Sequence, residues 1–185
     1  MSSKIRKNGP FPRTDMGSLI HTAPRIDPRY ARFKLRIGRS PIHRFGVFAA
    51  EAIPPRRKVI EYTGERISWR AARKLFAAMG FAKANKQTYL FEFNRYWVIN
   101  GAVGGCGAEF INHSCEPNLR QQTFKDHILL MSGRRIRRGE ELTYDYRFDK
   151  SAGRQPCACG SPKCRGTINL ERKEDWLYSA KRRRG

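Results

Sequence analysis

Short stretches of apolar residues, several of them alternating with polar ones, recur along the chain and are separated by glycine and proline. Residues 33–37 alternate apolar and basic side chains, as a strand with one buried face does. Since each stretch is short and bounded by turn-forming residues, we expect strands. The pattern predicts one domain that is mainly β. The other stretches cover residues 46–50, 59–64, 89–93, 97–99, 128–131 and 141–146.

One segment has the periodicity of a helix instead. In residues 69–79 the apolar side chains recur every three or four positions and fall on one face, which we expect to pack against the core. Ser68 is placed to cap the start of this helix, and Gly80 to end it. The residues on the apolar face are Trp69, Ala72, Leu75, Phe76 and Met79.

The charge of the chain adds a property of the surface. Among 185 residues, 38 Lys and Arg face 16 Asp and Glu, which gives a net charge of +22 and a pI near 10.6. Such a surface attracts polyanions such as nucleic acid, anionic lipid or an acidic protein, or it only keeps the protein in solution. Composition does not decide between these interpretations.

Hydropathy and cysteine usage exclude several classes of protein. No apolar run is long enough to span a bilayer, and residues 1–10 lack the apolar centre of a secretory signal. The five cysteines are an odd number, and three of them crowd into residues 157–164, which is unlike a disulfide framework. We therefore expect an intracellular protein in a reducing compartment, with no membrane association.

The crowded cysteines favour a metal site over free buried thiols. Cys157, Cys159 and Cys164 form a C-x-C-x4-C pattern that offers three thiolates on one tight loop. A structural zinc ion takes four such ligands in a tetrahedron, so a fourth ligand must come from elsewhere in the chain. Cys115 is the natural candidate, and Cys106 or a histidine is the rival.

Residues 110–118 concentrate polar side chains in a short stretch. An apolar pair leads into Asn112, His113, a serine and Cys115, and a proline and Asn118 follow. These amide and imidazole groups could hold a polar ligand. The alternative is a turn whose polar groups satisfy one another, with Asn118 bonding locally. The glycine-rich residues 101–107 lack the flanking strand and helix that a phosphate-binding loop needs.

Two tyrosines stand at alternate positions in the last expected strand. Tyr144 and Tyr146 should face the same way, since side chains alternate across a strand. Two phenols on one face could orient an amine. The alternative is a pair of ordinary tyrosines half-buried in a sheet.

These motifs follow one another in an order that resembles the SET-domain lysine methyltransferases with a zinc-binding post-SET segment. The resemblance rests on residues 38–49, 61–65, 110–118, 139–146 and the cysteine tail, and it covers roughly residues 33–170. It implies small, mostly antiparallel sheets with a pseudoknot, in which the segment matching 139–146 passes near the one matching 112–115. The implied parts are a basic arm (1–32), the SET domain (33–150), the post-SET zinc segment (151–170) and a basic tail (171–185).

The resemblance also implies a cofactor, S-adenosylmethionine, and residues that bind it. Arg44, Phe45 and Gly46 should approach the cofactor through backbone groups. Asn112 and His113 should bind its amino-acid part and its adenine through backbone and side-chain contacts. One structural zinc should be held by the four cysteines at 115, 157, 159 and 164.

On the substrate side, the resemblance implies a protein that presents a lysine. Tyr146 matches the tyrosine that lies closest to the reacting amine, where it also meets the cofactor. Tyr144 stands at a position that is phenylalanine or tyrosine in the family, and Tyr89 resembles the tyrosine that walls the lysine channel. A histone or another basic, nucleic-acid-associated protein is the expected substrate, and the tyrosine at 144 predicts mainly monomethylation.

This sequence departs from the family's pattern at three positions. Glu109 replaces an arginine that helps to hold the cofactor, while Cys106 and Asn100 stand where asparagine and aspartate are common. The alternative interpretation is therefore a catalytically weak SET-like module that binds nucleic acid or chromatin through its basic surface.

Overall fold

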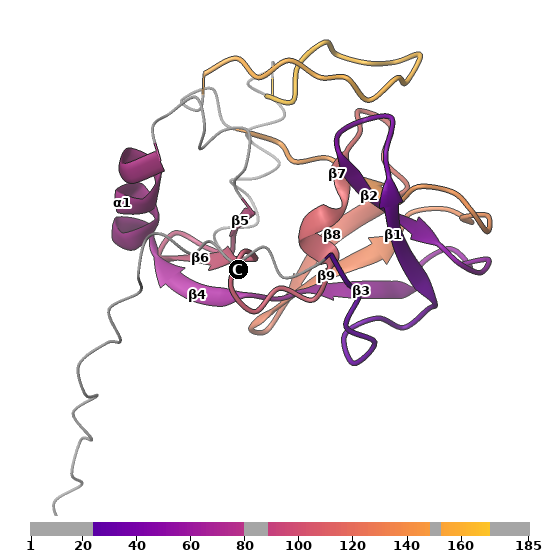
Figure 1. Ribbon diagram of the computed structural model, residues 1–185, viewed down its shortest axis with the longest axis horizontal. Coiled ribbons are helices and arrows are strands. Elements are labelled where there is room, and N and C mark those ends of the chain that lie inside the picture. Colours follow the sequence, from indigo (N-terminus) through magenta and orange to yellow (C-terminus); the bar gives the residue numbers. More distant parts are fainter. Residues whose placement is uncertain (1–23, 80–88, 149–152, 171–185) are drawn as a thin grey trace, which may run out of the picture.

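A computed structural model describes residues 24–79, 89–148 and 153–170 of the chain (Figure 1). Within these residues the chain forms ten short strands, one α-helix and one 3-10 turn. In chain order these are β1 (Leu35–Arg39), β2 (Phe45–Ala49), β3 (Lys58–Tyr62), β4 (Glu65–Ser68), α1 (Trp69–Met79), β5 (Leu90–Glu92), β6 (Trp97–Asn100), η1 (Ala108–Phe110), β7 (Asn112–His113), β8 (Leu119–Phe124), β9 (His127–Ser132) and β10 (Thr143–Tyr144).

The strands form four small sheets. Three sheets are antiparallel: β1 with β2, β3–β9–β8, and β4–β6–β5. The fourth sheet is the parallel pair of β7 and β10. This arrangement confirms the prediction of a mainly β domain built from small, mostly antiparallel sheets. In Figure 1 the β1–β2 hairpin lies at one end of the domain and the helix at the other, with β3, β8 and β9 between them.

Helix α1 confirms the predicted helix and its cap. The Oγ of Ser68 accepts a hydrogen bond from the backbone N–H of Ala71 at 3.2 Å, which satisfies one of the free donors at the helix start. Ala72 is fully buried, and the helix packs beside β4 and β6. The side chains of Phe76 and Met79, and the expected end at Gly80, lie outside the described residues.

The core is formed between the sheets by branched aliphatic side chains, which suit strands because they pack well on a pleated surface. Fully buried side chains come from β2, β3, β8 and β9 and from the segments that flank β7 and β10. The segment 24–32 is irregular but lies against this core, with Ala31 paired to Ile60 and the N–H of Asp27 bonded to the carbonyl of Cys106. The largest of the fully buried residues are Ile53, Ile60, Ile111, Leu119, Ile128, Leu130, Ile136 and Leu142.

Three strands were not predicted, and one predicted strand was too long. β7 lies in the polar stretch 110–118, for which no strand was expected. β4 and β8 carry mostly polar residues, and in β8 only Leu119 is fully buried. The strand expected over 141–146 is limited to Thr143–Tyr144. Beyond it the N–H of Tyr146 bonds to the His113 ring instead of a neighbouring strand, and Arg147 takes a left-handed conformation with φ 55°.

Candidate active site and cysteine cluster

The parallel pair of β7 and β10 brings together two motifs that lie about thirty residues apart in the sequence. Thr143 pairs with Asn112, and Tyr144 pairs with His113. The N–H of Ser114 also bonds to the carbonyl of Tyr144 at 3.3 Å. The polar stretch and the tyrosine strand therefore form one site, as the resemblance implied.

An aromatic cluster surrounds the two tyrosines. The ring centroids of Tyr144 and Tyr146 lie 4.8 Å apart, so the two phenols are side by side although only Tyr144 belongs to the strand. Tyr144 stacks on Phe91 at 5.6 Å, and Tyr146 contacts Phe148 at 5.7 Å. The expected Tyr89 packs against Phe110 at 5.6 Å.

The two tyrosine hydroxyls differ in their hydrogen bonds. The Oη of Tyr146 donates to the carbonyl of Ile111 at 2.8 Å. Within the described residues the hydroxyl of Tyr144 has no hydrogen-bond partner, so it is free to bind a ligand or water. Burial raises the pKa of both phenols, and the neighbouring Tyr89 phenol raises that of Tyr146 further. Both hydroxyls are therefore neutral at physiological pH.

The expected cofactor-binding turn lies directly next to this site. Arg44 and Phe45 are exposed, and Arg44 has a left-handed φ of 39°. Gly46 is buried, and a Cβ on it would lie 2.2 Å from Oε1 of Glu141. A side chain at this position would have to displace the Glu141 carboxylate, so the backbone of Gly46 packs directly against that carboxylate.

The side chain of Asn112 is engaged by protein groups. Its Nδ2 donates to the carbonyl of Phe45 at 2.9 Å, to Oε1 of Glu141 at 2.8 Å and to Oγ of Ser40 at 3.0 Å. The Ser40 hydroxyl in turn donates to the same carboxylate at 2.8 Å. Asn112 thus ties β2 to the segment before β10, and its contact with a cofactor stays a prediction.

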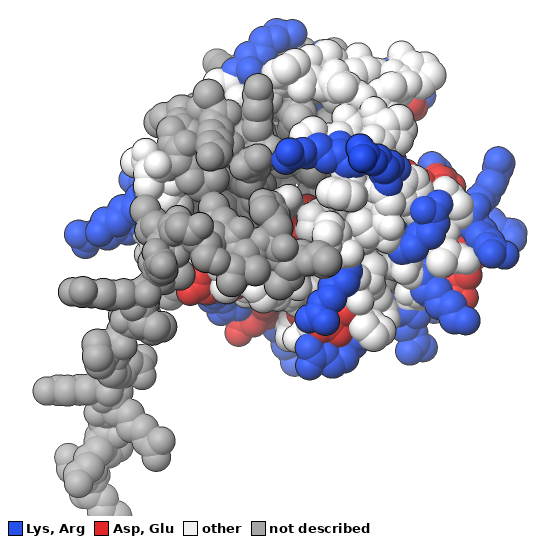
Figure 2. All heavy atoms as spheres, viewed as in Figure 1, with Lys and Arg blue, Asp and Glu red and all other residues white. Residues whose placement is uncertain are grey.

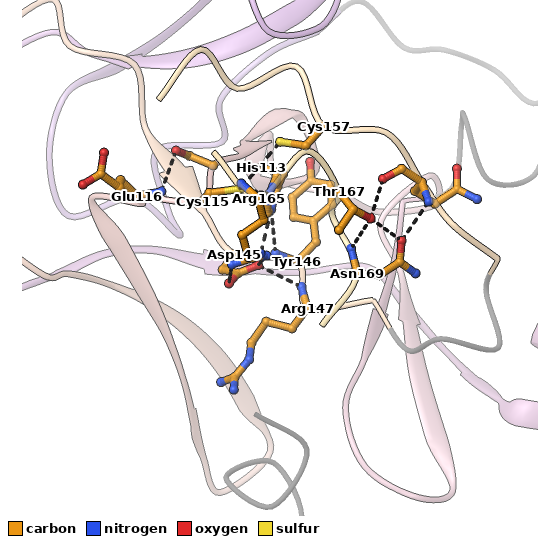
Figure 3. A network of polar contacts seen from close by, with 12 residues as sticks. His113, Cys115, Glu116, Asp145, Tyr146, Arg147, Cys157, Arg165, Thr167 and Asn169 are labelled. Carbon is orange, nitrogen blue, oxygen red and sulfur yellow. Dashed lines mark hydrogen bonds and ion pairs between the residues drawn. The ribbon is translucent and has the colours of Figure 1, made fainter. Parts of the chain in front are cut away.

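His113 is buried and joins the tyrosine strand to the cysteines (Figure 3). Its Nδ1 accepts the N–H of Tyr146 at 3.2 Å, and its Nε2 lies 3.5 Å from Sγ of Cys115. Burial lowers the pKa of His113 to about 4, which keeps the ring neutral. Because Nδ1 accepts a hydrogen bond, the single ring proton belongs on Nε2, where it faces the sulfur.

The four expected cysteines lie together. The Sγ atoms of Cys115, Cys157, Cys159 and Cys164 all lie within 4.8 Å of one another, and those of Cys115 and Cys157 are 3.7 Å apart. Four sulfurs around zinc at its usual bond length are separated by about 3.8 Å, so the cluster fits a zinc ion. The rival Cys106 is buried elsewhere, with its Sγ 2.9 Å from the carbonyl of Glu61.

Two charged residues that the sequence analysis did not single out connect the cluster to the tyrosines. Nη1 and Nη2 of Arg165 donate to the two oxygens of Asp145 at 2.8 and 2.9 Å, and the N–H of Arg165 points to Sγ of Cys115 at 3.4 Å. Figure 3 shows Arg165 between the sulfur and the carboxylate. Their positions gave a signal: Arg165 directly follows Cys164, and Asp145 stands between the two tyrosines.

The unusual Glu109 packs under the glycine-rich loop. Its Oε2 accepts the N–H of Gly107 at 2.8 Å, and a Cβ on Gly105 would lie 2.6 Å from its carboxylate. Burial raises the pKa of this carboxyl group. The loop is thus packed around a side chain, and it shows no feature of a phosphate site.

Asn118 shows that the polar turn does not satisfy itself locally. Its Nδ2 donates to the carbonyl of Glu141 at 2.7 Å, and its Oδ1 accepts the N–H of Thr143 at 2.9 Å. Both partners lie more than twenty residues away. The alternative of a locally bonded Asn118 is therefore wrong, because the side chain holds the chain that leads into β10.

A parallel strand pair beside clustered tyrosines, with a four-cysteine loop packed against it, is the arrangement expected of a SET domain with a post-SET segment. Comparison with protein families agrees. The sequence model described as "SET domain" matches residues 44–147, more than half of the 185 residues, so the chain belongs to the SET-domain family.

Several curated proteins are similar to this chain. The histone-lysine N-methyltransferase TRX1 of Oryza sativa subsp. japonica is 40% identical over 146 residues, which cover 75% of this chain and 14% of that protein. The "Histone-lysine N-methyltransferase, H3 lysine-4 specific" of Schizosaccharomyces pombe is 40% identical over 143 residues, covering 74% and 15%. The histone-lysine N-methyltransferase set1 of Dictyostelium discoideum is 36% identical over 174 residues, covering 90% and 11%.

The chain thus spans between 11 and 15% of the length of these relatives. Within the described residues, no helix is both long enough and apolar enough to cross a membrane.

Proposed function

We propose that this chain transfers a methyl group from S-adenosylmethionine to the side-chain amine of a lysine in a protein substrate. The observation that carries the proposal is the pair of tyrosines, the buried Tyr144 and the partly buried Tyr146, held beside His113 by the parallel strand pair. Membership of the SET-domain family and relatives named histone-lysine N-methyltransferases support it.

The two tyrosines suit the chemistry of amine methylation. A lysine amine must lose its proton before it attacks, and a dry aromatic channel lowers its pKa because the charged form is poorly solvated there. The Tyr146 hydroxyl, which donates to Ile111, keeps its lone pairs free to accept a hydrogen bond from the amine. Tyr146 would hold the neutral amine; bound S-adenosylmethionine would supply the methyl carbon, its sulfur would keep the electron pair of the broken carbon–sulfur bond, and the amine would release its extra proton to water.

We propose that the methyl donor binds against the turn formed by Arg44, Phe45 and Gly46 and against the backbone of Asn112 and His113. This turn adjoins Asn112, whose side chain bonds to the carbonyl of Phe45. When bound, S-adenosylmethionine supplies an activated methyl group on a sulfonium cation. Such a cation suits a site lined by electron-rich aromatic rings, and the protein contributes mainly alignment of the reacting atoms.

We propose that one zinc ion occupies the four-cysteine cluster and has a structural role. Four thiolates leave no open position for catalysis, so the ion would hold the loop 157–164 against Cys115 and close it over the site.

The charge of the chain bears on its substrate. A chain of net charge +22 repels a free basic histone tail. When the tail is bound to nucleic acid, the negative charge of the nucleic acid attracts the chain. Figure 2 shows Lys and Arg spread over the described part of the visible face, with few acidic residues among them. We therefore propose a histone or another nucleic-acid-bound protein inside the cell as substrate. Activity on it should fall steeply as salt rises, and a flat salt profile would contradict this.

We further propose that Tyr144 limits the product mainly to monomethyl-lysine. Its unpaired hydroxyl lies next to Tyr146, where it and a bound water would crowd an amine that already carries a methyl group. Tyr144→Phe should shift the products toward di- and trimethyl-lysine, as read by mass spectrometry of a peptide substrate. One relative of Arabidopsis thaliana is named a trimethyltransferase, so abundant trimethyl-lysine from the wild type is the outcome that would contradict this proposal.

The activity itself is tested with a matched pair of variants. Tyr146→Phe and Tyr62→Phe each remove one hydroxyl bonded to a carbonyl, at 2.8 and 2.7 Å. Both should lose similar stability, but only Tyr146→Phe should lower turnover by on the order of a hundredfold or more. Equal turnover of the two variants would contradict the role of Tyr146.

Calorimetric titration with S-adenosylmethionine distinguishes between the two proposed functions, an enzyme and a SET-like binding module. Saturable heat is expected for the enzyme. Its absence would favour the binding module, in which Glu109 has replaced a residue that holds the cofactor.

A further inference from the structure

Arg165 contacts both the cysteine cluster and the tyrosine segment. Its backbone N–H points to Sγ of Cys115, and its guanidinium makes two hydrogen bonds to Asp145. The side chains of Arg165 and Asp145 are 27% and 22% exposed, so this ion pair is screened less by water than a surface pair. The planar fork of arginine fixes the direction of the carboxylate as well as its distance.

The Asp145 carboxylate in turn holds the backbone that carries Tyr146. Its Oδ1 accepts the N–H of Arg147 at 3.2 Å and lies 3.4 Å from Nδ1 of His113. Arg147 has a left-handed φ of 55°, a conformation that a non-glycine residue keeps only when its surroundings hold it. The anchored carboxylate therefore helps to hold the turn after β10, together with the bonds of Tyr146 to His113 and Ile111.

A second polar contact between the cysteine loop and the SET domain takes a different route. Lys163 and Ser161 both contact the carboxylate of Glu116, the ion pair being 3.1 Å long with side chains 80% and 40% exposed. Glu116 follows Cys115 and, within the described residues, makes no hydrogen bond or ion pair with residues 144–147. What distinguishes Arg165 from Lys163 is therefore its partner: Arg165 bonds to Asp145 in the tyrosine segment, and Lys163 pairs with Glu116.

We propose that Arg165 is a positioning residue, which transmits the closed state of the cysteine site to Tyr146 through Asp145. Assembly of the four-cysteine site places Arg165, Arg165 fixes Asp145, and Asp145 fixes the turn that orients the catalytic tyrosine. This inference rests on the proposed function for the meaning of Tyr146, but the coupling itself is a property of the fold.

The test measures the backbone of the tyrosine segment directly. Hydrogen–deuterium exchange is followed in the peptide 143–148 for the zinc-loaded wild type, Arg165→Gln, Asp145→Asn and the control Lys163→Gln. Both ion-pair variants should retain zinc and exchange faster in this peptide, by on the order of tenfold, since a charge-assisted bidentate contact is lost. Lys163→Gln should behave as the wild type. Arg165→Lys, which keeps the charge without the fork, should lie between.

Two further measurements separate positioning from a general loss of structure. Removing zinc from the wild type with a chelator should raise exchange in 143–148, and should raise it less in Arg165→Gln, where the link is already broken. In methyl transfer, Arg165→Gln should lower kcat about tenfold with little change in KM for S-adenosylmethionine, as expected when transition-state alignment is lost.

The outcomes are distinguishable. Wild-type exchange in 143–148 for zinc-loaded Arg165→Gln would overturn the proposal, and so would loss of zinc in that variant but not in Asp145→Asn, since Arg165 would then act on the metal alone. Faster exchange in both ion-pair variants supports the coupling even if the wild type methylates no substrate. In that case only the proposed function fails.

Discussion

Replacing Asn112 by alanine should destabilise the domain by several kcal/mol, because this side chain joins three separate segments. Its Nδ2 carries two protons and lies within 3.0 Å of three acceptors, on Phe45, Glu141 and Ser40. The residue is buried, at 7% exposure. Alanine would leave the carbonyl of Phe45 without this donor and the carboxylate of Glu141 with fewer partners.

The size of the effect follows from the kind of bond that is lost. A hydrogen bond to a neutral carbonyl contributes about 1 kcal/mol and one to a carboxylate about 2 kcal/mol, and a buried acceptor left unpaired costs about 1 kcal/mol more. We therefore expect Asn112→Ala to cost about 4 kcal/mol. Asn112→Asp should cost more at neutral pH, since it sets a second carboxylate against Glu141.

Urea unfolding followed by circular dichroism measures this cost. All variants are compared at one fixed zinc concentration, since an ion bound only to the folded state adds to the apparent stability. Asn94→Ala is the matched control: this exposed asparagine also makes two hydrogen bonds, accepting the N–H groups of Tyr96 and Trp97 at 2.9 and 3.0 Å. It should cost about 1 kcal/mol. An equal loss of stability in both variants would contradict the role of the Asn112 side chain in joining separate segments.

For three further substitutions the structure predicts the direction of the effect. Gly46→Ala should destabilise the domain by about 1–3 kcal/mol in the same unfolding experiment, because its Cβ would lie 2.2 Å from the carboxylate of Glu141; an unchanged midpoint would show that the carboxylate moves freely. Cys159→Ser should lose zinc in metal analysis, where the wild type should hold about one ion per chain, while Cys106→Ser should retain it; retention by both would rule out the four-cysteine site. Burial raises the pKa of Glu109 above its ordinary value of 4.5, so the folded state binds this proton more tightly than the unfolded chain and stability falls as the pH rises above that value. Glu109→Gln should remove that fall, and identical stability–pH curves would contradict the raised pKa.

The four-cysteine cluster and the helix could be predicted because their signals are local. Ligand chemistry restricts a structural zinc site to a few residue types, and three of the four cysteines lie within eight residues of one another. The helix has its own apolar periodicity and a serine cap, so its bounds do not depend on distant contacts. The fourth cysteine was selected from rivals by the family resemblance, and the geometry agrees with that choice.

The strands β4 and β8 could not be predicted because their stability comes from their partners. β8 pairs along its whole length with β9, and its outward residues are polar, so no alternation of apolar positions marks it. β4 likewise pairs with β6 through residues that carry no buried apolar face. Strands of this kind are visible only when the register of the neighbouring strand is known.

The polar residues of the candidate site show a second limit, which concerns what a side chain is used for. Asn112 and His113 were interpreted as ligand contacts because polar groups in a short motif suit recognition, and Asn118 was named in the alternative as a locally bonded turn residue. In the structure each of them bonds to a segment more than twenty residues away. A sequence motif reveals the type of each side chain, but the group to which that side chain bonds depends on the fold.

The protein partners of these polar side chains affect which residues can influence the chemistry. The side chains of Asn112 and Asn118 use their amide protons on the protein, and Nδ1 of His113 accepts the N–H of Tyr146, so these residues hold the backbone in place around the site. The hydroxyl of Tyr144 has no hydrogen-bond partner among the described residues, and neither does the buried Nε of Arg165. Variation of substrate or product among relatives should therefore act through the residue at 144 and its aromatic neighbours, while substitutions of the two asparagines should first reduce stability.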